Sequence, residues 1–170
     1  GGYPSKYGCT KFKRFIRGGT VDRPTENDIE KLKALNVTTV IDLRGDFEFI
    51  NQPNGTERLT DNVEHMSLYE MNVAEAKGMK KALTEVYEYI IDNYKENVCK
   101  ALKSVADAPD GAVFYHCFLG KDRTGILSML LLTIAGVEED DIVADYQLTY
   151  TYLEKYMCTH ADTLWDTDPE

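Results

Sequence analysis

The sequence predicts an α/β domain in which a central, mainly parallel sheet is flanked by helices. Two short runs of apolar and β-branched residues, Val37–Leu43 and Ala112–His116, are typical of buried strands. Helical spacing of apolar residues precedes each run and resumes after the second. This alternation favours parallel strands joined by helical crossovers. A length of 170 residues suits one compact unit, so we expect residues 1–170 to form a single domain.

The first helix and strand are predicted from the signals at their ends. Thr25 can cap a helix over residues 25–36, and Asp28 follows three residues later, as in a capping box. The next strand ends at Asp42-Leu43-Arg44. These two charged side chains are therefore expected at the carboxyl end of a buried strand.

The remaining elements follow from the same periodicities. Pro53, Asn54 and Gly55 indicate a loop over residues 47–62. We then expect a strand over 63–69, a helical stretch over 79–108, the strand over 112–116, a helix over 124–135 and a last amphipathic helix over 138–156. In such folds, functional sites gather where strands end and helices begin.

Composition and charge argue against a nucleic-acid partner and against a segment that spans a membrane. The formal net charge is −10 and no large basic cluster occurs, whereas a nucleic-acid binder needs a positively charged face. The locally basic stretch Lys11–Arg17 is interpreted as a strand with a solvated face, or as one that turns Arg17 into an anion site. The longest apolar run, Ile126–Val137, is shorter than the roughly 18 to 20 residues that span a bilayer. We expect neither a nucleic-acid partner nor an integral membrane segment.

Cysteine and histidine usage bears on compartment and metal binding. Four widely spaced cysteines without a CxxC pair favour reduced thiols and a cytoplasmic setting. The chain begins abruptly at Gly1-Gly2-Tyr3, as a trimmed or mature form would, so secretion stays the alternative. The three histidines are scattered, and neither HExxH nor DxD occurs. We expect no metal and no cofactor.

The most informative segment is His116–Gly125, which reads HCFLGKDRTG and joins a strand to a helix. Cys117, five intervening residues and Arg123 have the spacing of a phosphate cradle, in which backbone amides point inward and the helix adds its positive end. The guanidinium of Arg123 can hold two phosphate oxygens, and the same field favours a thiolate. The cradle comprises Phe118, Leu119, Gly120, Lys121, Asp122 and Arg123.

A lone cysteine at the end of an apolar strand is most often a small buried hydrophobe, but the full pattern is far narrower. It resembles the protein tyrosine phosphatase superfamily, whose signature is His-Cys, five residues, then Arg followed by Ser or Thr. More narrowly, it is similar to an atypical bacterial branch that reads HCxxGKDRTG. Members of that branch include secreted phosphatases active on phosphotyrosine, phosphoserine/threonine and phosphoinositides. Further matching segments are Gly1–Tyr3, Phe15–Arg17, Asp42–Arg44 with Glu48, and Ile142–Thr149.

The resemblance implies a role for each residue of the loop. Cys117 would be the nucleophile and Arg123 the phosphate clamp. His116 would hold the loop geometry and help keep the thiol ionised. Thr124 would donate a hydrogen bond to the sulfur as it leaves. The resemblance also implies a fold like that of a protein tyrosine phosphatase.

The larger tyrosine phosphatases place the general acid on a Trp-Pro-Asp loop, and no such triplet occurs in this chain. In the atypical branch an aspartate inside the loop has this role, which here is Asp122. Asp42 and Asp46 are competitors.

The Asp42-Leu43-Arg44 segment has two interpretations. The charged pair can pin the neighbouring loop, with Arg44 paired to Glu48, or it can contact the substrate. The family commonly has Ser after the arginines that match Arg17 and Arg44. This chain has Gly18 and Gly45, which leaves the local hydrogen bonds open.

The predicted activity is hydrolysis of phosphomonoesters through a phosphocysteine, with phosphorylated protein or peptide, above all phosphotyrosine, as substrate. Lys121 adds a second cation that could suit a phosphoinositide or merely offset Asp122. The alternatives are a phosphoinositide phosphatase of the same mechanism and a phosphate-binding module without turnover. Sulfur transfer as in rhodanese-like domains is disfavoured, since those loops lack the KDRTG run.

Overall fold

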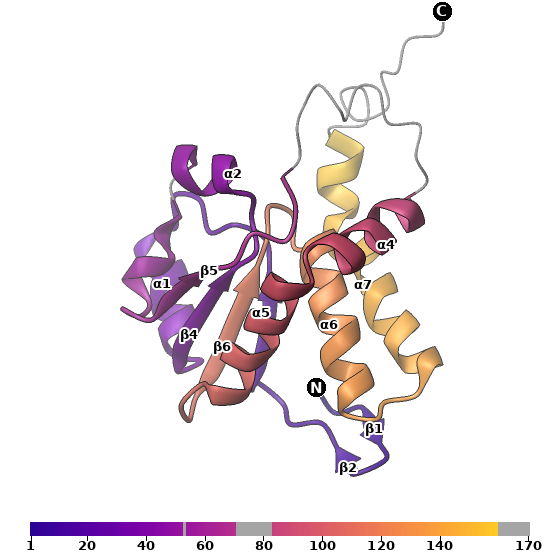
Figure 1. The fold of residues 1–170 in the computed structure, drawn as a ribbon. Helices are drawn as coiled ribbons and strands as arrows, with labels where there is room; N and C mark the ends of the chain where they lie inside the picture. Colours follow the sequence, from indigo (N-terminus) through magenta and orange to yellow (C-terminus); the bar gives the residue numbers. More distant parts are fainter. Residues whose placement is uncertain (53, 71–82, 160–170) are drawn as a thin grey trace, which may run out of the picture.

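The computed structural model describes residues 1–52, 54–70 and 83–159 (Figure 1). Four strands form a sheet in the order β3-β6-β4-β5, and every pairing within it is parallel. The strands are β3 (Phe15–Gly18), β4 (Val37–Asp42), β5 (Val63–His65) and β6 (Ala112–His116). The predicted α/β fold with a parallel sheet is therefore confirmed. Near the N-terminus, β1 (Pro4–Ser5) and β2 (Gly8–Cys9) form a separate antiparallel pair.

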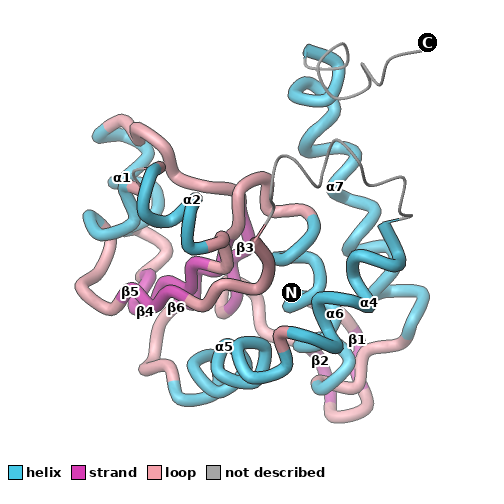
Figure 2. Tube along the Cα trace, turned by 45° about the horizontal axis from the view of Figure 1, so that its top comes forward, coloured by secondary structure: helices cyan, strands magenta, loops and turns pink. Residues whose placement is uncertain are grey.

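Helices cover both faces of the sheet, with α5 on one side and α1 and α2 on the other (Figure 2). The described helices are α1 (Glu26–Lys33), α2 (Asp46–Asn51), α4 (Leu83–Asn93), α5 (Lys95–Asp107), α6 (Asp122–Ile134) and α7 (Glu139–Thr159), with a short 3₁₀ helix η1 (Gly55–Arg58). None of these helices is both long enough and apolar enough to cross a bilayer.

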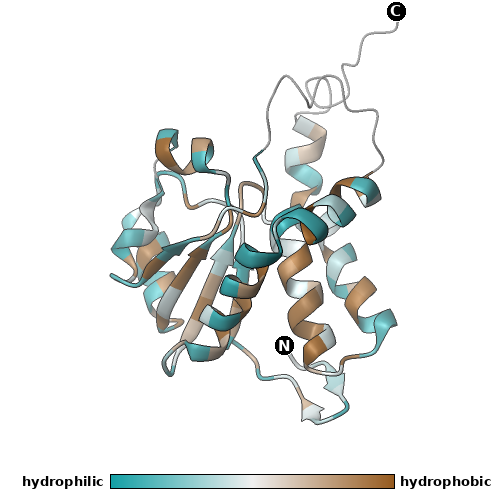
Figure 3. Ribbon diagram, in the orientation of Figure 1, coloured by the Kyte–Doolittle hydropathy of each residue, from teal (hydrophilic) through white to brown (hydrophobic). Residues whose placement is uncertain are grey.

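The pleat of the central strands separates the core into two clusters. Alternate strand residues point to opposite faces, so Ile41 and Val113 pack toward α4, α5 and α6, while Val40 and Phe114 pack on the other side. All five residues of β6 are buried, as are most residues of β4. The brown colour of β6 and α6 marks this apolar centre (Figure 3).

The local start signals act as predicted. The hydroxyl of Thr25 accepts a hydrogen bond from the amide of Asp28, and the Asp28 carboxylate accepts one from the amide of Thr25. Helix α1 therefore begins at Glu26 and ends at Lys33, slightly inside the predicted range. Gly136, with φ of 73°, follows the end of α6 in the left-handed region that glycine tolerates.

Three predicted elements differ from the structure. The expected loop over residues 47–62 contains α2, because the amide of Gly45 is bound by the Glu48 carboxylate and a helical turn follows. The expected strand over 63–69 pairs only over Val63–His65. The expected helix over 79–108 is two helices separated at Tyr94, whose φ and ψ of −111° and 26° interrupt the helix; residues 79–82 lie outside the described residues.

Parallel pairing places the carboxyl ends of neighbouring strands at one edge of the sheet. Asp42 at the end of β4 is the register partner of His116 at the end of β6, and Gly18 at the end of β3 pairs with His116 from the other side. The segment after β6 therefore emerges between the ends of two strands, and α2 follows β4 at the same edge.

Candidate active site

The loop between β6 and α6 carries the predicted phosphate cradle. Cys117 is 2% exposed and directly follows the buried strand, while Arg123 is 5% exposed and lies in the first turn of α6. Within the described residues, no protein group accepts a hydrogen bond from the backbone amides of Phe118–Lys121. Free amides at the positive end of a helix are the surroundings that bind a phosphate.

Close backbone packing explains the glycines around this loop. Gly120 has φ of 72°, and a Cβ there would lie 2.4 Å from the carbonyl of Gly18. The amide of Thr20 donates to the carbonyl of Phe118 at 2.9 Å, which ties the loop to the segment after β3. A Cβ on Gly18 would lie 2.9 Å from the Phe114 ring. The absence of Ser at this position therefore has a steric reason in this chain.

Arg123 is held by Glu48 from α2. Its Nη1 donates to Oε2 of Glu48, and its Nη2 donates to Oε1 at 3.1 Å. Oε2 also accepts a hydrogen bond from the amide of Gly45 at 2.9 Å. Burial alone would raise the pKa of Glu48, but the hydrogen bonds and positive charge of Arg123 outweigh it and hold that pKa below its ordinary value. Glu48 thus fixes the orientation of the Arg123 guanidinium.

The expected pair between Arg44 and Glu48 is wrong, since Arg44 binds Asp42 instead. Its Nη2 lies 2.7 Å from Oδ2 of Asp42, and Nε donates to both carboxylate oxygens at 3.0 Å. Both side chains are fully buried, because they lie at the covered end of β4, whereas Glu48 lies on α2 near Arg123. Burial opposes ionisation of Asp42, yet the hydrogen bonds and positive charge of Arg44 hold the pKa of Asp42 below its ordinary value. This position supports the strand end and gives no access to a leaving group.

His116 is fully buried beside this ion pair. Nδ2 of Asn54 lies 2.9 Å from Nε2 of His116 and also donates to Oδ2 of Asp42 at 3.1 Å. Because the amide nitrogen can only donate, Nε2 accepts and the ring proton lies on Nδ1, which is 3.3 Å from the carbonyl oxygen of Cys117. Burial lowers the pKa of His116, which agrees with a neutral ring. The sequence indicated Asn54 only as a loop residue.

Asp122, the first residue of α6, is contacted from two sides. Its Oδ1 accepts hydrogen bonds from Nζ of Lys121 and from the hydroxyl of Tyr87 on α4. The Tyr87 hydroxyl lies 2.7 Å from that of Tyr146 on α7. Both tyrosines were missed as site residues, since Tyr87 belongs to an apolar helical stripe and its hydroxyl carries no local signal.

The side chains of the other candidates have no hydrogen bond to the loop within the described residues. Arg17 donates to Asp145 at 2.6 Å and to Thr149 at 3.0 Å, which ties β3 to α7. Asp46 has a side chain that is 71% exposed and lies near His65. The hydroxyl oxygen of Thr124 is buried and has no hydrogen-bond partner in the described part of the chain, so the expected bond to the sulfur is not formed in this structure.

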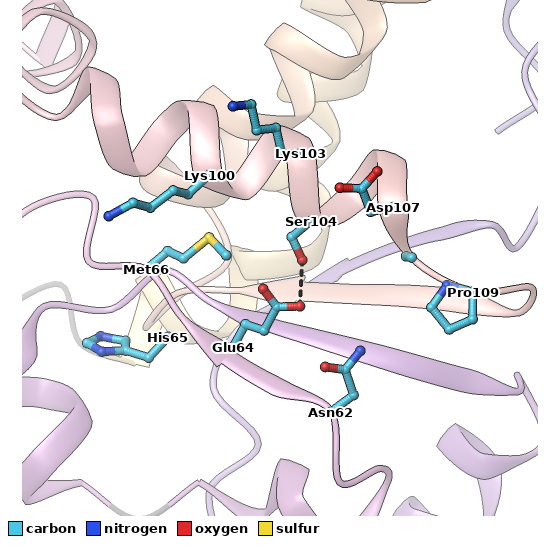
Figure 4. Close-up of a pocket in the computed structure, with 10 residues that line it drawn as sticks. Asn62, Glu64, His65, Met66, Lys100, Lys103, Ser104, Asp107 and Pro109 are labelled. Carbon is cyan, nitrogen blue, oxygen red and sulfur yellow. Dashed lines mark hydrogen bonds between the residues drawn. The ribbon is translucent and has the colours of Figure 1, made fainter.

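The cavities near the sheet differ in their relation to the loop. One of about 600 Å³ lies between β5 and α5, where Glu64 accepts a hydrogen bond from Ser104 at 2.8 Å (Figure 4). No residue of the loop lines it. A second of about 520 Å³ lies between β3 and α7 and reaches Leu119 and Gly120. Across the described ranges, no three His, Cys, Asp or Glu side chains gather as metal ligands would.

Comparison with known proteins agrees with the loop motif. The sequence model of the tyrosine phosphatase family matches residues 1–167. A protein of Nostoc commune named tyrosine-protein phosphatase is 33% identical over 147 residues, which cover 82% of this chain and 49% of that protein. A protein of Cupriavidus necator is 27% identical over 146 residues, which cover 78% of this chain and 52% of that protein.

A third relative is the triple specificity protein phosphatase PtpB of Mycobacterium tuberculosis, which is 27% identical over 166 residues, covering 78% of this chain and 59% of that protein. The chain spans about half the length of the curated relatives it matches. The matched region nevertheless includes the whole segment from β3 to α7 in the family comparison.

Proposed function

Because this chain belongs to the tyrosine phosphatase family, we propose that it hydrolyses phosphomonoesters, most readily protein phosphotyrosine, through a phosphocysteine intermediate. The observation that carries this proposal is the placement of Cys117 at the base of a loop whose Arg123 is already oriented by Glu48. A thiol, a row of free amides and a fixed guanidinium together form a site for nucleophilic displacement at phosphorus.

The first step transfers the phosphoryl group to sulfur. The thiolate of Cys117 attacks phosphorus, the S–P bond forms, and the P–O bond to the leaving group breaks. Arg123 and the loop amides stabilise the charge on the transferring oxygens. Asp122 gives its proton to the leaving oxygen, so the product departs as an alcohol or phenol.

The second step restores the enzyme. Water attacks phosphorus, the O–P bond forms, and the S–P bond breaks with its electron pair returning to Cys117. Asp122, now a carboxylate, takes the proton from the attacking water. The buried hydroxyl of Thr124, which has no partner in the described residues, is the group that we expect to stabilise the departing sulfur.

His116 has a supporting role in this proposal. Its neutral ring donates from Nδ1 to the carbonyl of Cys117 and accepts from Asn54, so it fixes the backbone at the nucleophile. The positive field on the thiolate then comes from Arg123, the amides and the end of α6, rather than from an imidazolium. Asp42 and Arg44 hold the strand end beneath this loop.

The substrate preference follows from the partner of Lys121. Its Nζ donates to Oδ1 of Asp122, so this side chain is engaged inside the loop instead of being directed at a second phosphate. Phosphotyrosine peptides are therefore the leading substrates and phosphoinositides the alternative. The name of the mycobacterial relative includes triple specificity, which supports assays on more than one class of phosphorylated substrate.

A turnover assay tests the proposal. The chain is expected to hydrolyse a chromogenic aryl phosphate equally well with and without a chelator. Cys117→Ser should abolish turnover yet still bind vanadate, because a serine hydroxyl is hardly ionised at neutral pH while the cradle remains. Cys99→Ser, at an exposed cysteine, is the matched control and should keep full activity. Vanadate binding without turnover by the unaltered chain would favour a phosphate-binding module instead.

A further inference from the structure

Two donors converge on a single oxygen of Asp122. Tyr87 from α4 and Lys121 from the loop both donate to Oδ1, although they come from parts of the chain that are far apart in sequence. Oδ2 of Asp122 has no hydrogen-bond partner among the described residues. The Asp122 side chain is 28% exposed, so this second oxygen belongs to a group that solvent can reach.

The hydrogen bonds in this cluster have only one consistent direction. A tyrosine hydroxyl has one proton, and a carboxylate can only accept. Tyr87 therefore donates its only hydroxyl proton to Asp122. Tyr146 must then donate to the hydroxyl oxygen of Tyr87, at 2.7 Å. Burial, followed by the bond to Asp122, raises the pKa of Tyr87, so this hydroxyl keeps its proton. The chain of donors runs from Tyr146 through Tyr87 to Asp122.

An independent observation shows that the fold is shaped to receive Tyr146. Gly125 lies inside α6, where glycine is less favourable than alanine. A Cβ at Gly125 would lie 2.8 Å from Cε2 and 3.0 Å from Cδ2 of the Tyr146 ring. The rings of Tyr146 and Tyr87 then meet edge to face, with centroids 6.5 Å apart. The last glycine of the loop motif thus leaves room for the ring of Tyr146 to pack against α6.

We propose that Tyr87, supported by Tyr146, is a positioning residue that reserves Oδ2 of Asp122 as the oxygen that carries the catalytic proton. This inference rests on the proposed role of Asp122 as general acid. Because Tyr87 and Lys121 already occupy Oδ1 as donors, the proton of the acid form lies on Oδ2. Oδ1 can accept from both donors in the carboxylic acid as well as in the carboxylate, so Asp122 can give and retake a proton on Oδ2 without rearrangement of its neighbours.

The experiment compares leaving groups in four proteins: the unaltered chain, Tyr87→Phe, Asp122→Asn and the double variant. Phenyl phosphate has a poor leaving group that needs an acid, whereas a fluorinated coumarin phosphate has a good one that needs little help. Tyr87→Phe keeps the ring and removes only the hydroxyl. We expect kcat on phenyl phosphate to fall about tenfold, with KM and vanadate affinity nearly unchanged and the coumarin substrate little affected.

The double variant separates positioning through Asp122 from a general structural effect. In the Asp122→Asn background, Tyr87→Phe should cause no further loss, because the group that it positions is already inactive. Tyr89→Phe is the matched control, since Tyr89 lies two residues away on α4 and is 48% exposed. It should leave the leaving-group dependence as it is.

Two outcomes overturn the inference in distinguishable ways. A loss from Tyr87→Phe that persists in the Asp122→Asn background, or that is equal for both substrates, removes Tyr87 as a positioning residue while the phosphatase proposal stands. An equal loss from Asp122→Asn on both substrates removes the acid assignment and the inference with it. Should Tyr87→Phe unfold, Tyr146→Phe and Gly125→Ala carry the same test, and each should reproduce the selective loss on phenyl phosphate.

Discussion

The carboxylate of Glu48 receives both terminal nitrogens of Arg123, which joins α2 to the first turn of α6. The two residues are far apart in sequence, and the pair is almost wholly buried. Two parallel hydrogen bonds fix the plane of the guanidinium as well as its position. In the proposed mechanism, the Arg123 guanidinium therefore does not need to be ordered when phosphate arrives, which lowers the entropic cost of reaching the transition state.

Arg123→Lys should lower kcat/KM by about 10²–10³-fold despite the retained charge. An ammonium cannot make two planar contacts with phosphate and two with Glu48 at once. The measurement is steady-state kinetics on an aryl phosphate, with Arg58→Lys as control at a surface ion pair with Glu26. Near-normal kinetics of Arg123→Lys would show that a point charge suffices.

Glu48→Gln should reduce the free energy of unfolding by about 2 kcal/mol, because it leaves a buried guanidinium without its counter-charge. Glu26→Gln is the control, since the Glu26 side chain is 84% exposed and a surface pair contributes little. Denaturant unfolding and kcat/KM are measured on the same samples. A stable variant with normal kcat/KM would contradict the orienting role of Glu48.

The lowered pKa of Glu48 also determines in which direction the free energy of unfolding changes with pH. Its stabilising contribution is present above the unfolded pKa of about 4.3 and is lost as pH falls through the folded pKa. The difference in unfolding free energy between the unaltered chain and Glu48→Gln should therefore shrink below about pH 4. A difference that stays constant down to strongly acidic pH would show that the two proteins differ for another reason.

His116 should make the protein less stable as pH falls from 7 to 5.5. Because burial lowers its pKa, the unfolded chain binds a proton in this range and the folded chain does not. The expected loss is about 1 kcal/mol, measured by denaturant titration at each pH. His116→Gln should flatten this slope, whereas His65→Gln should not. An unchanged slope in His116→Gln would mean that the ring is charged in the folded state.

The pairing of Lys121 with Asp122 predicts the order of substrates. A phosphotyrosine peptide should be hydrolysed with a higher kcat/KM than a soluble short-chain phosphoinositide. Lys121→Met should change the ratio of the two by less than about threefold, since Nζ of the lysine is already bound to Asp122. A selective loss of phosphoinositide hydrolysis would instead make Lys121 a specificity residue.

Features encoded by neighbouring residues were predictable, and contacts between distant segments were not. The strand over 112–116 and the cap at Thr25 depend on short local patterns, and the structure has both where the sequence indicates them. The phosphate cradle that follows the strand stays a prediction. The partner of Glu48 depends on how α2 lies over the sheet edge. Sequence proximity suggested Arg44, but Arg44 folds back on Asp42 two residues away.

The contacts of Tyr87 and Tyr146 could not be predicted from the sequence for a related reason. Tyr87 has the spacing of a core residue, and its ring does pack in the apolar interior. Only the direction of its hydroxyl, which reaches Asp122 on another helix, gives it a second role. No periodicity in one helix can report such a contact, because it depends on the relative placement of α4, α6 and α7.

The position of β6 between β3 and β4 has a consequence for protein synthesis. Phe15 leaves the ribosome long before Val113, its partner in the sheet, has been made. The backbone of Gly18, against which the loop packs at Gly120, must therefore wait until residue 120 has been made. In the proposed mechanism, the nascent chain gains activity only when β6 has completed the sheet between β3 and β4.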